Sequence, residues 1–368
     1  MLAVLWDHIC TVPGLVVFLQ RAARRFDVSS LVIWKRAVVL LLRYGFRPDE
    51  IASSGLVNPA DAPRDIVFGK HRLTWYQRQY NPIQWECLVE DKAVFYAYCE
   101  ALRLPVPKVY AVIDRDGGWT AAGVALSTRG EWQRFFEYEL PDEFIIKPAG
   151  GVYGRGVNLF RREGAAFEDF SGRRFSPAAL YKHLQTDSTY SRYVIQERVR
   201  NHADIQRLTG TQSLQTARIS TWVNKRGNVE IYDVTHKLVL GKNITDNYDS
   251  GRSGNISSAV DPHTGTIIAL LGPSPDGIGY EALPFHPVTG IKITGKILPD
   301  WPATVQLAEK AARLFLPLRT VGWDIALTPR GPVLMEGNAW WDPFNHMHWP
   351  EARRRELAQF MRRFTTDS

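Results

Sequence analysis

The sequence predicts an α+β protein built on antiparallel sheets. Short apolar strand patterns follow one another through the second half of the chain and are broken by only a few helical segments. Regular alternation of strand and helix, which is typical of parallel sheets, is absent. The 368 residues allow two domains or one large bilobed unit. A hydrophobic content of 45% with 23% charged residues excludes wholesale disorder.

The first 90 residues are expected to be mostly helical. Apolar residues recur with helical spacing over 13–26 and over 30–44, where Ser30 is the expected N-cap. Residues 53–90 are rich in Pro, Asn and aromatic side chains and show no clear period. Irregular structure is therefore expected for 53–90.

From residue 91 onward, strands and a few helices are expected. A helix begins at Asp91 and ends before Pro105, because proline cannot continue a helix. Ser176-Pro177 has the cap-then-proline pattern of a helix start. Further elements are predicted from apolar runs between turn residues: strands at 108–113, 144–147, 157–160, 193–197, 218–223 and 229–240, a helix at 301–316 and a hairpin at 321–336.

Three segments bear on contact with a membrane. The apolar run 15–19 is too short to span a bilayer. The run 31–42 is interrupted by Lys35 and Arg36, which fits either a buried amphipathic helix or a basic helix docked on an anionic membrane. Residues 351–368 contain five Arg and three acidic residues and are expected to form a helix with a solvated face.

The charge balance indicates an anionic partner. Lys and Arg number 45 against 38 Asp and Glu, a net charge of +7, which would suit phosphates, nucleic acid or an anionic membrane. No aromatic-basic RNA motif and no DNA-reading helix is present, so a nucleic-acid partner is not expected. The three scattered cysteines fit neither a disulfide framework nor a zinc site, which points to a reducing cytosol.

A glycine-rich loop lies between two predicted strands and follows Lys147. Its four glycines are Gly150, Gly151, Gly154 and Gly156. Glycines let backbone N–H groups approach an anion closely, so the loop is a candidate flap over phosphates with Lys147 as a fixed positive charge. The order of a P-loop is absent, and a merely flexible hairpin turn is the alternative.

The predicted hairpin near the C-terminus carries two acids. With a turn at Pro329–Gly331, Asp324 lies across from Glu336, and Asn338 follows on the same face. Facing carboxylates repel each other, whereas two carboxylates and an amide oxygen suit Mg²⁺ bridging substrate phosphates. The alternative is that each acid binds a nearby Arg, and a one-residue bulge would break this register.

Basic residues lie on the strands between these two motifs. Arg218 is suited to stabilise a transferring phosphoryl group because its planar fork matches phosphate oxygens, and Lys237 ends the following strand. Taken singly, each of these residues is more often a surface residue on an exposed sheet face.

Taken together, these residues resemble the ATP-grasp superfamily. The shared features are Lys147 with its flap, the hinge Ile195-Gln196-Glu197-Arg198-Val199 and the hairpin Asp324…Glu336-Gly337-Asn338, over roughly residues 91–345. Within the superfamily the sequence is most similar to the sugar-transfer-associated group of polysaccharide-biosynthesis genes. That likeness rests on Gly45-Phe46-x-Pro48, Asp91-Lys92, Thr216-x-Arg218, Asp246-Asn247, His286-Pro287-x-Thr289-Gly290 and Gly322-Trp323-Asp324.

The resemblance implies an ATP-grasp fold, in which two α+β lobes clasp the nucleotide after a mostly helical N-terminal region. The implied division is a helical region at 1–90, a lobe with the lysine strand and flap at 91–200, a lobe with the metal hairpin at 201–350 and a C-terminal helix at 351–368.

The resemblance also implies a role for each site residue. The hinge would meet adenine, Asp204 is a candidate ribose contact, and Lys147 and the flap would meet the phosphates. Arg218 would lie at the γ-phosphate. The full implied set is Lys92, Lys147, Gly150, Gly151, Gly154, Gly156, Gln196, Glu197, Val199 and Asp204 for ATP, Asp324, Glu336 and Asn338 for Mg²⁺, and Arg218 and Lys237 for catalysis.

The implied reaction is carboxylate–amine ligation through an acyl phosphate, which attaches an amino acid or similar acid to a cell-surface polysaccharide or its precursor. Two alternatives are a kinase that phosphorylates a sugar or other small-molecule hydroxyl, and a non-catalytic nucleotide-binding scaffold. A cytoplasmic protein is expected, with residues 1–90 as the candidate contact to the inner membrane face or a glycosyltransferase. Departures from the expected pattern at Ser250-Gly251-Arg252-Ser253-Gly254 and Trp340-Trp341-Asp342 lie where the acceptor should bind, so the substrates stay open.

Overall fold

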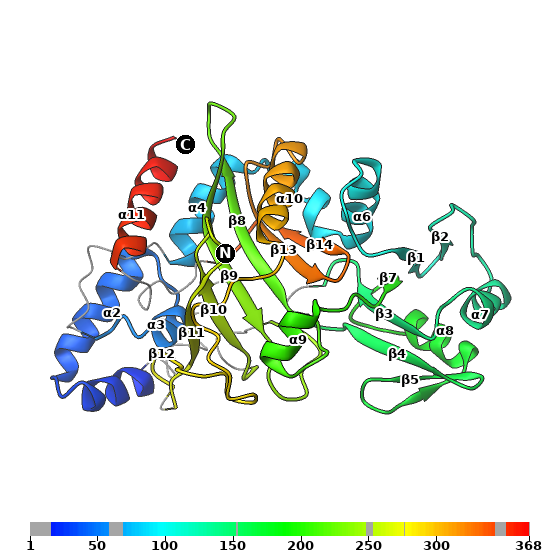
Figure 1. Ribbon diagram of the computed structural model, residues 1–368, viewed down its shortest axis with the longest axis horizontal. Helices are drawn as coiled ribbons and strands as arrows, with labels where there is room; N and C mark the ends of the chain where they lie inside the picture. The colour runs from blue at the N-terminus through cyan, green and yellow to red at the C-terminus, as the bar shows by residue number, and fades with distance from the viewer. Residues whose placement is uncertain are drawn as a thin grey trace.

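Two antiparallel sheets form the frame of the protein (Figure 1). The computed structural model describes residues 16–58, 69–151, 154–247, 253–275, 277–342 and 351–367. Within these ranges each sheet has seven strands, and every neighbouring pair of strands is antiparallel. The predicted α+β class with antiparallel sheets is confirmed.

The first sheet carries the lysine strand and the hinge. In spatial order its strands are β2 (Gly117–Thr120), β1 (Val109–Asp114), β7 (Arg192–Glu197), β3 (Glu143–Pro148), β4 (Asn158–Glu163), β5 (Ala166–Asp169) and β6 (Arg174–Phe175). The helices α7 (Arg129–Tyr138) and α8 (Pro177–Gln185) pack on it and bury Trp132, Phe136 and Leu180 in one apolar core. The predicted cap holds, since the Ser176 side chain accepts a hydrogen bond from the Ala179 N–H.

The second sheet carries the acidic hairpin and the basic strands. In spatial order it consists of β12 (Tyr280–Ala282), β11 (Ile267–Pro273), β10 (Ile256–Val260), β9 (Val229–Leu238), β8 (Thr216–Val223), β13 (Thr320–Thr328) and β14 (Gly331–Asn338). The helix α10 (Trp301–Leu314) covers one face with an apolar core, and α9 (Ala203–Thr209) links the two sheets. No element was predicted for β10 to β12.

Two helices from opposite ends of the chain pack on the other face of the second sheet. The expectation of irregular structure at 53–90 is wrong, because α4 (Lys70–Tyr80) is a regular helix. It buries Leu73, Gln77 and Tyr80, and a polar residue at one buried position hides the helical period from the sequence.

The C-terminal helix α11 (Glu351–Thr366) is present as predicted, but its description as a solvated helix was incomplete. Its buried side chains are Leu357, Phe360, Met361 and Phe364, which join the α4 residues and Trp222 in one cluster. The Tyr80 hydroxyl donates a hydrogen bond to the Phe364 carbonyl. The inner side of α11 is therefore mainly apolar, and one of its five arginines, Arg353, also points inward and donates to the Tyr232 carbonyl.

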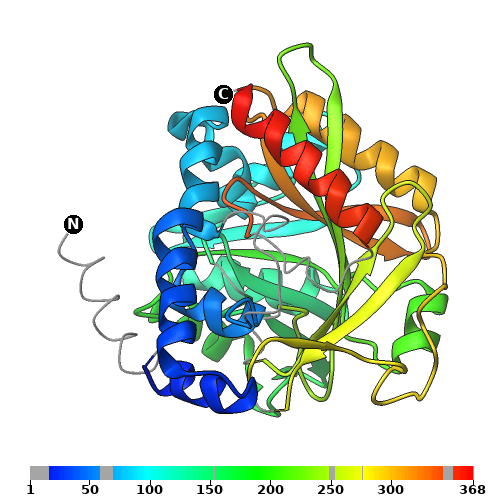
Figure 2. The same ribbon diagram turned by 90° about the vertical axis from the view of Figure 1, so that its left-hand side faces the viewer.

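The N-terminal helices lie at the end of the molecule away from the first sheet, beside α11 (Figures 1 and 2). Residues 16–25 are helical and precede α2 (Ser30–Tyr44) and α3 (Pro48–Ser54). The N-cap of α2 is Ser29 rather than Ser30. Two short helices, η2 (Ile83–Trp85) and α5 (Cys87–Glu90), then lead to α6 (Lys92–Ala101), whose Asp91 cap accepts hydrogen bonds from two backbone N–H groups. No helix within the described ranges is long and apolar enough to cross a membrane.

Candidate functional site

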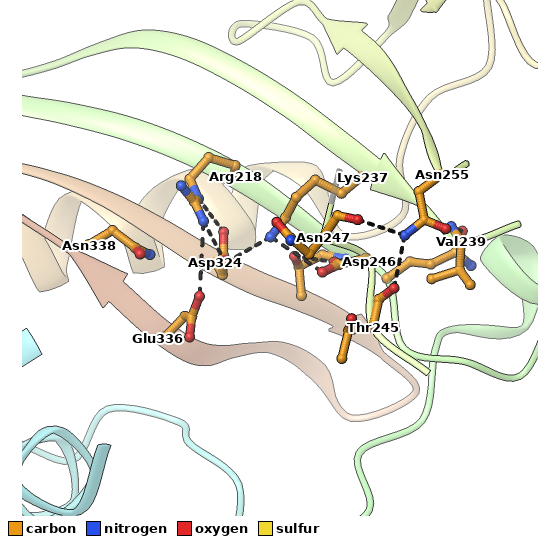
Figure 3. A network of polar contacts seen from close by, with 12 residues as sticks. Arg218, Lys237, Val239, Thr245, Asp246, Asn247, Asn255, Asp324, Glu336 and Asn338 are labelled. Carbon is orange, nitrogen blue, oxygen red and sulfur yellow. Dashed lines mark hydrogen bonds and ion pairs between the residues drawn. The ribbon is translucent and has the colours of Figure 1, made fainter. Parts of the chain in front are cut away.

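Arg218, Asp324 and Glu336 form one row across three strands of the second sheet. Asp324 on β13 pairs with Arg218 on β8 on one side and with Glu336 on β14 on the other. Figure 3 shows the three side chains on the same face, with Lys237 of β9 beside them and Asn338 farther along β14. This face lies opposite the one that α10 covers, where Ile219 and Trp323 are buried.

The predicted pairing of Asp324 with Glu336 is found, although the hairpin that produces it differs in two ways. The turn contains only Pro329 and Arg330, since Thr328 already pairs with Gly331. A bulge then places two residues of β14 opposite one step of β13, with Met335 as the extra residue. The two offsets cancel, so the bulge restores the register that puts Glu336 across from Asp324.

Asp324 is a buried carboxylate neutralised by two cations. It is 2% exposed. The Arg218 guanidinium donates to both carboxylate oxygens, and the Lys237 Nζ donates to Oδ2 at 2.8 Å. Burial alone would raise the pKa of Asp324, but the positive charges of Arg218 and Lys237 hold it well below its usual range. Asp324 is therefore ionised at every physiological pH.

Glu336 is half-buried and lies among cations. Its carboxylate is 3.6 Å from Lys92 Nζ and 4.0 Å from the Arg218 guanidinium. The Asn338 side-chain amide donates to the Gly322 carbonyl at 3.3 Å, which leaves its oxygen as an acceptor on the same face. No group of three or more His, Cys, Asp or Glu residues that could hold a metal was found in the described part of the chain.

The predicted donor set fits Mg²⁺ that is shared with a substrate. Two carboxylates and one carboxamide oxygen are hard ligands, and Mg²⁺ commonly binds through one or two carboxylates with substrate phosphates and water completing its octahedron. Arg218 and Lys237 neutralise in this structure the charge that a bound cation would offset. The sequence left two alternatives for this hairpin, a Mg²⁺ site or acids bound to a nearby Arg. The structure contains the contact between Asp324 and Arg218, and it also places the carboxylate and amide oxygens of the Mg²⁺ site on one face.

Lys147 is buried on the first sheet and faces the second. It is 6% exposed, and its Nζ donates to the Tyr96 hydroxyl of α6 at 2.6 Å. Burial, followed by repulsion from Lys92, lowers the pKa of Lys147 to about 7. A bound polyanion would raise the pKa of Lys147 again and so favour its charged form.

The flap lies close to Thr245, beyond the end of β9, and is hydrogen-bonded to α6. Gly154 and Gly156 have positive φ angles of 68° and 74°, which glycine adopts without strain. A Cβ on Gly154 would be 2.7 Å from the Thr245 hydroxyl, so the flap approaches Thr245 closely. The Lys92 Nζ donates to the Gly151 carbonyl at 2.7 Å. A Cβ on Gly150 would meet nothing within 4 Å, so crowding does not require glycine there.

A pocket of about 380 Å³ lies between the flap and the segments 242–247 and 253–255. Its lining includes two basic residues, Arg155 and Lys242, together with several amide and hydroxyl side chains. The pocket therefore offers both positive charge and hydrogen-bond donors next to the candidate phosphate flap.

The predicted hinge lies where β7 leaves the first sheet. Gln196 is buried in β7, and the Glu197 carboxylate already accepts hydrogen bonds from the Lys108 N–H and the Arg330 guanidinium. Val199 packs in a small apolar cluster with Leu214, Ala326, Val333 and Met335. Asp204, the candidate ribose contact, is half exposed on α9 and pairs with Arg207.

Two residues of the site were not assigned a role from the sequence. Tyr96 holds Lys147, but within α6 it looks like one more member of an apolar face. Asp246 accepts hydrogen bonds from the Thr216 N–H and hydroxyl and is 3.4 Å from Lys237 Nζ. Burial would lower the pKa of Lys237, but Asp246 and Asp324 raise it above its usual value. The Asp246-Asn247 pair was the only sequence signal for this contact.

A family model described as "Sugar-transfer associated ATP-grasp" matches residues 71–350. The search of curated proteins found no match.

Three enzymes are among the solved structures that match this chain. The biotin carboxylase domain of Hydrogenobacter thermophilus 2-oxoglutarate carboxylase, in complex with MgADP, ADP and bicarbonate, is 13% identical over 73% of this chain and 45% of its own, with a TM-score of 0.39. The D-alanine-D-alanine ligase of Coxiella burnetii is 10% identical over 76% and 56%, with a TM-score of 0.39. The ATP complex of the Bacillus anthracis D-alanine–D-alanine ligase is 10% identical over 76% and 66%, with a TM-score of 0.40. This chain spans about half the length of the first two.

Proposed function

The chain belongs to the sugar-transfer associated ATP-grasp family, and on that premise we propose that it is an ATP- and Mg²⁺-dependent ligase that joins a carboxylate to an amine through an acyl phosphate. Membership confirms the resemblance of the three motifs and, with it, the ATP-grasp fold of two α+β lobes preceded by a helical region.

One observation carries the proposal: the row Arg218–Asp324–Glu336 with Lys237 beside it. Carboxylates that face each other in a ladder are destabilising unless positive charge lies between them. Here cations from neighbouring strands surround the acids on the face opposite α10, beside the apolar cluster that α4 and α11 form on that face. Such an arrangement supports a site for polyphosphate and a divalent cation.

The proposal gives each residue of the candidate site a role. Lys147, Lys92 and the flap glycines bind the ATP phosphates, and the hinge backbone with the Val199 cluster holds adenine, with Asp204 near the ribose. Asp324, Glu336 and Asn338 hold Mg²⁺, which neutralises phosphate charge and orients the γ-phosphate. Arg218 and Lys237 orient the carboxylate and stabilise charge on the transferring phosphoryl group.

The substrates proposed are small carboxylates and amines, at least one of them linked to a sugar of a cell-surface polysaccharide or its precursor. The family description supports this class. Work on cytoplasmic precursors would place the protein in the cytoplasm and at the inner membrane face. We divide the chain for this purpose into the regions 1–90, 91–200, 201–350 and 351–368.

Helix α2 is the proposed membrane contact. Leu31, Val38 and Leu42 are 64%, 43% and 82% exposed and lie along one side of the helix at spacings of seven and four. Residues 16–44 contain six Lys or Arg and one acid, Asp27. An exposed apolar stripe within a basic segment fits the surface of an anionic bilayer.

The test measures acyl phosphate formation directly. The protein is incubated with Mg²⁺, ATP and a panel of sugar acids and amino acids, with hydroxylamine to trap acyl phosphates as hydroxamates. We expect both ADP and hydroxamate, and Glu336→Gln should lower ADP release by about 100-fold or more through loss of a metal ligand. Glu336 is chosen over Asp324 because loss of the Asp324 carboxylate would leave the Arg218 and Lys237 cations without their buried partner.

Glu137→Gln, which changes an exposed residue on α7, is the matched control and should keep full activity. A stable phosphate ester in place of hydroxamate would establish a kinase. Nucleotide binding without ADP release from any acceptor would support a scaffold. Unchanged ADP release in Glu336→Gln would overturn the metal assignment.

A further inference from the structure

Three polar side chains next to Arg218 each have a buried oxygen without a hydrogen-bond partner. Asp233, Thr235 and Ser257 are 3%, 5% and 1% exposed. Asp233 Oδ1, Thr235 Oγ1 and Ser257 Oγ have no hydrogen-bond partner. More than nine in ten buried polar groups in proteins are hydrogen-bonded, so three exceptions at neighbouring positions call for an explanation.

The strand register places all three on the face of the candidate site. Thr235 pairs with Arg218 across β9 and β8, and Ser257 pairs with Lys237 across β10 and β9. Asp233 pairs with Ser220, two residues along β8 from Arg218. Because side chains alternate along a strand, Asp233, Thr235 and Lys237 project from the same face of β9.

The partner that these groups lack must include a hydrogen-bond donor. An ionised carboxylate only accepts hydrogen bonds, whereas the two hydroxyls can both donate and accept. The neighbouring cations on this face are engaged, since Arg218 binds Asp324 and Lys237 binds Asp324 and Asp246. Arg353 of α11, the charged group facing Asp233 from the other side, donates to the Tyr232 carbonyl. An ammonium group would satisfy both the geometry and the charge.

We propose that Asp233, Thr235 and Ser257 form the subsite that holds the ammonium group of the amine substrate and that Asp233 accepts its proton. The proposal rests on the ligase function above and adds the location of the amine. Directly opposite residues in a sheet lie about 5 Å apart and diagonal neighbours about 7–8 Å apart. An amine held here is therefore within reach of an acyl phosphate bound at Arg218.

The transfer step joins the amine nitrogen to the acyl carbon and releases phosphate. The Asp233 carboxylate takes a proton from the ammonium group, and the freed nitrogen lone pair forms a C–N bond with the acyl carbon. The C–O bond to phosphate breaks, and the phosphate leaves with the electron pair. It also takes the second N–H proton, so that the products are a neutral amide and hydrogen phosphate. Burial raises the pKa of Asp233 to about 7, even though Arg353 opposes this, so the carboxylate can both accept and release a proton near neutral pH.

The first experiment separates the two half-reactions. Hydroxylamine is neutral at pH 7.5 and reacts with acyl phosphates in solution, so hydroxamate formation needs no ammonium subsite. In Asp233→Asn we expect hydroxamate formation within about twofold of wild type, and at least a 100-fold loss of kcat/KM for amines that are protonated at this pH. The loss should shrink at higher pH as the free amine becomes available. A parallel loss in both assays would overturn the role of Asp233.

A binding measurement makes the subsite testable without turnover. Saturation-transfer NMR on the MgADP-loaded protein compares ethanolamine with ethylene glycol, which lacks the charge. We expect contact with ethanolamine only, lost in Asp233→Asn and weakened in Thr235→Val and Ser257→Ala. Equal signals from both probes, or unchanged ethanolamine contact in all three variants, would overturn the proposal. Failure to form any hydroxamate would instead refute the ligase function alone.

The variants should fold, because Thr235→Val and Ser257→Ala remove hydroxyls without a partner, and Asp233→Asn keeps one side-chain oxygen to accept the Val234 N–H. Their melting temperatures are expected to equal or exceed that of the wild type, which distinguishes a ligand site from a structural network. Asp116→Asn, at an exposed turn, is the matched control and should change neither assay.

Discussion

In the proposed ATP site, Lys147 would make nucleotide affinity depend on pH. Burial and the neighbouring Lys92 lower its pKa to about 7, and bound phosphates would raise it. ATP binding therefore takes up a proton above pH 7. We expect the affinity for MgATP to be greatest below pH 7 and to fall by up to about tenfold per pH unit above it. Calorimetric titrations in buffers of different ionisation enthalpy measure both the affinity and the proton uptake.

Lys147→Met is the control for that prediction. The variant should bind MgATP more weakly at pH 6 and lose most of the pH dependence that wild type shows between pH 7 and 9. Comparison with this variant removes the contribution of the phosphate groups of ATP itself. A wild-type affinity that is flat over this range would contradict the assignment of Lys147 to the phosphates.

At the residue scale, the sequence predicted the acids and basic residues better than their partners. Lys147, Asp324 and Glu336 could be found because they stand at fixed places in motifs. Asp233, Thr235 and Ser257 could not, because their importance depends on the pairing of β8, β9 and β10. The sequence of one strand does not show which residue of a neighbouring strand will lie opposite a given side chain. It also does not show that a polar atom there will lack a hydrogen-bond partner.

At the scale of single elements, α11 anchors the C-terminal end of the described chain to the second sheet. Phe364 is fully buried and its ring lies 4.7 Å from Tyr80 and 5.6 Å from Trp222. We expect Phe364→Ala to lower the free energy of unfolding by about 3–5 kcal/mol, because the cavity adds to the lost transfer energy. Urea denaturation measures this change. Arg362→Ala, on the exposed side of α11, should stay within about 0.5 kcal/mol of wild type.

Elements were predictable where an apolar period or a cap marks them. The observed ends of three helices agree with the predicted ends within a few residues. Gly45 marks the end of α2, Asp91 the start of α6 and Trp301 the start of α10. Helix α4 was missed because Gln77 occupies a buried position, where it donates to the Trp341 carbonyl. The hairpin was predicted with the right partners only because a shorter turn and a bulge offset each other.

At the scale of the whole molecule, the exposed stripe on α2 predicts binding to anionic vesicles. The protein should sediment with vesicles containing phosphatidylglycerol and not with pure phosphatidylcholine, and added salt should weaken the binding. Changing both Leu31 and Leu42 to Glu should reduce the binding by about 10-fold or more, because two apolar side chains are lost from the contact. Val124→Glu, at an exposed apolar residue beside the first sheet, should have no effect. Equal binding of the double variant would remove α2 from the contact.

The order of the strands in the second sheet also determines when the site can exist during synthesis. Arg218 and Asp324 are 106 residues apart in the chain, yet they share one ion pair on adjacent strands. While the ribosome is still making β9 to β12, β8 has no neighbour on its β13 side, and Arg218 and Lys237 have no Asp324 to neutralise them. Contacts this distant form slowly, because a long loop must close before they contribute. The proposed ATP site is thus incomplete in the nascent chain until the last hairpin docks, and that docking completes the sheet and the site together.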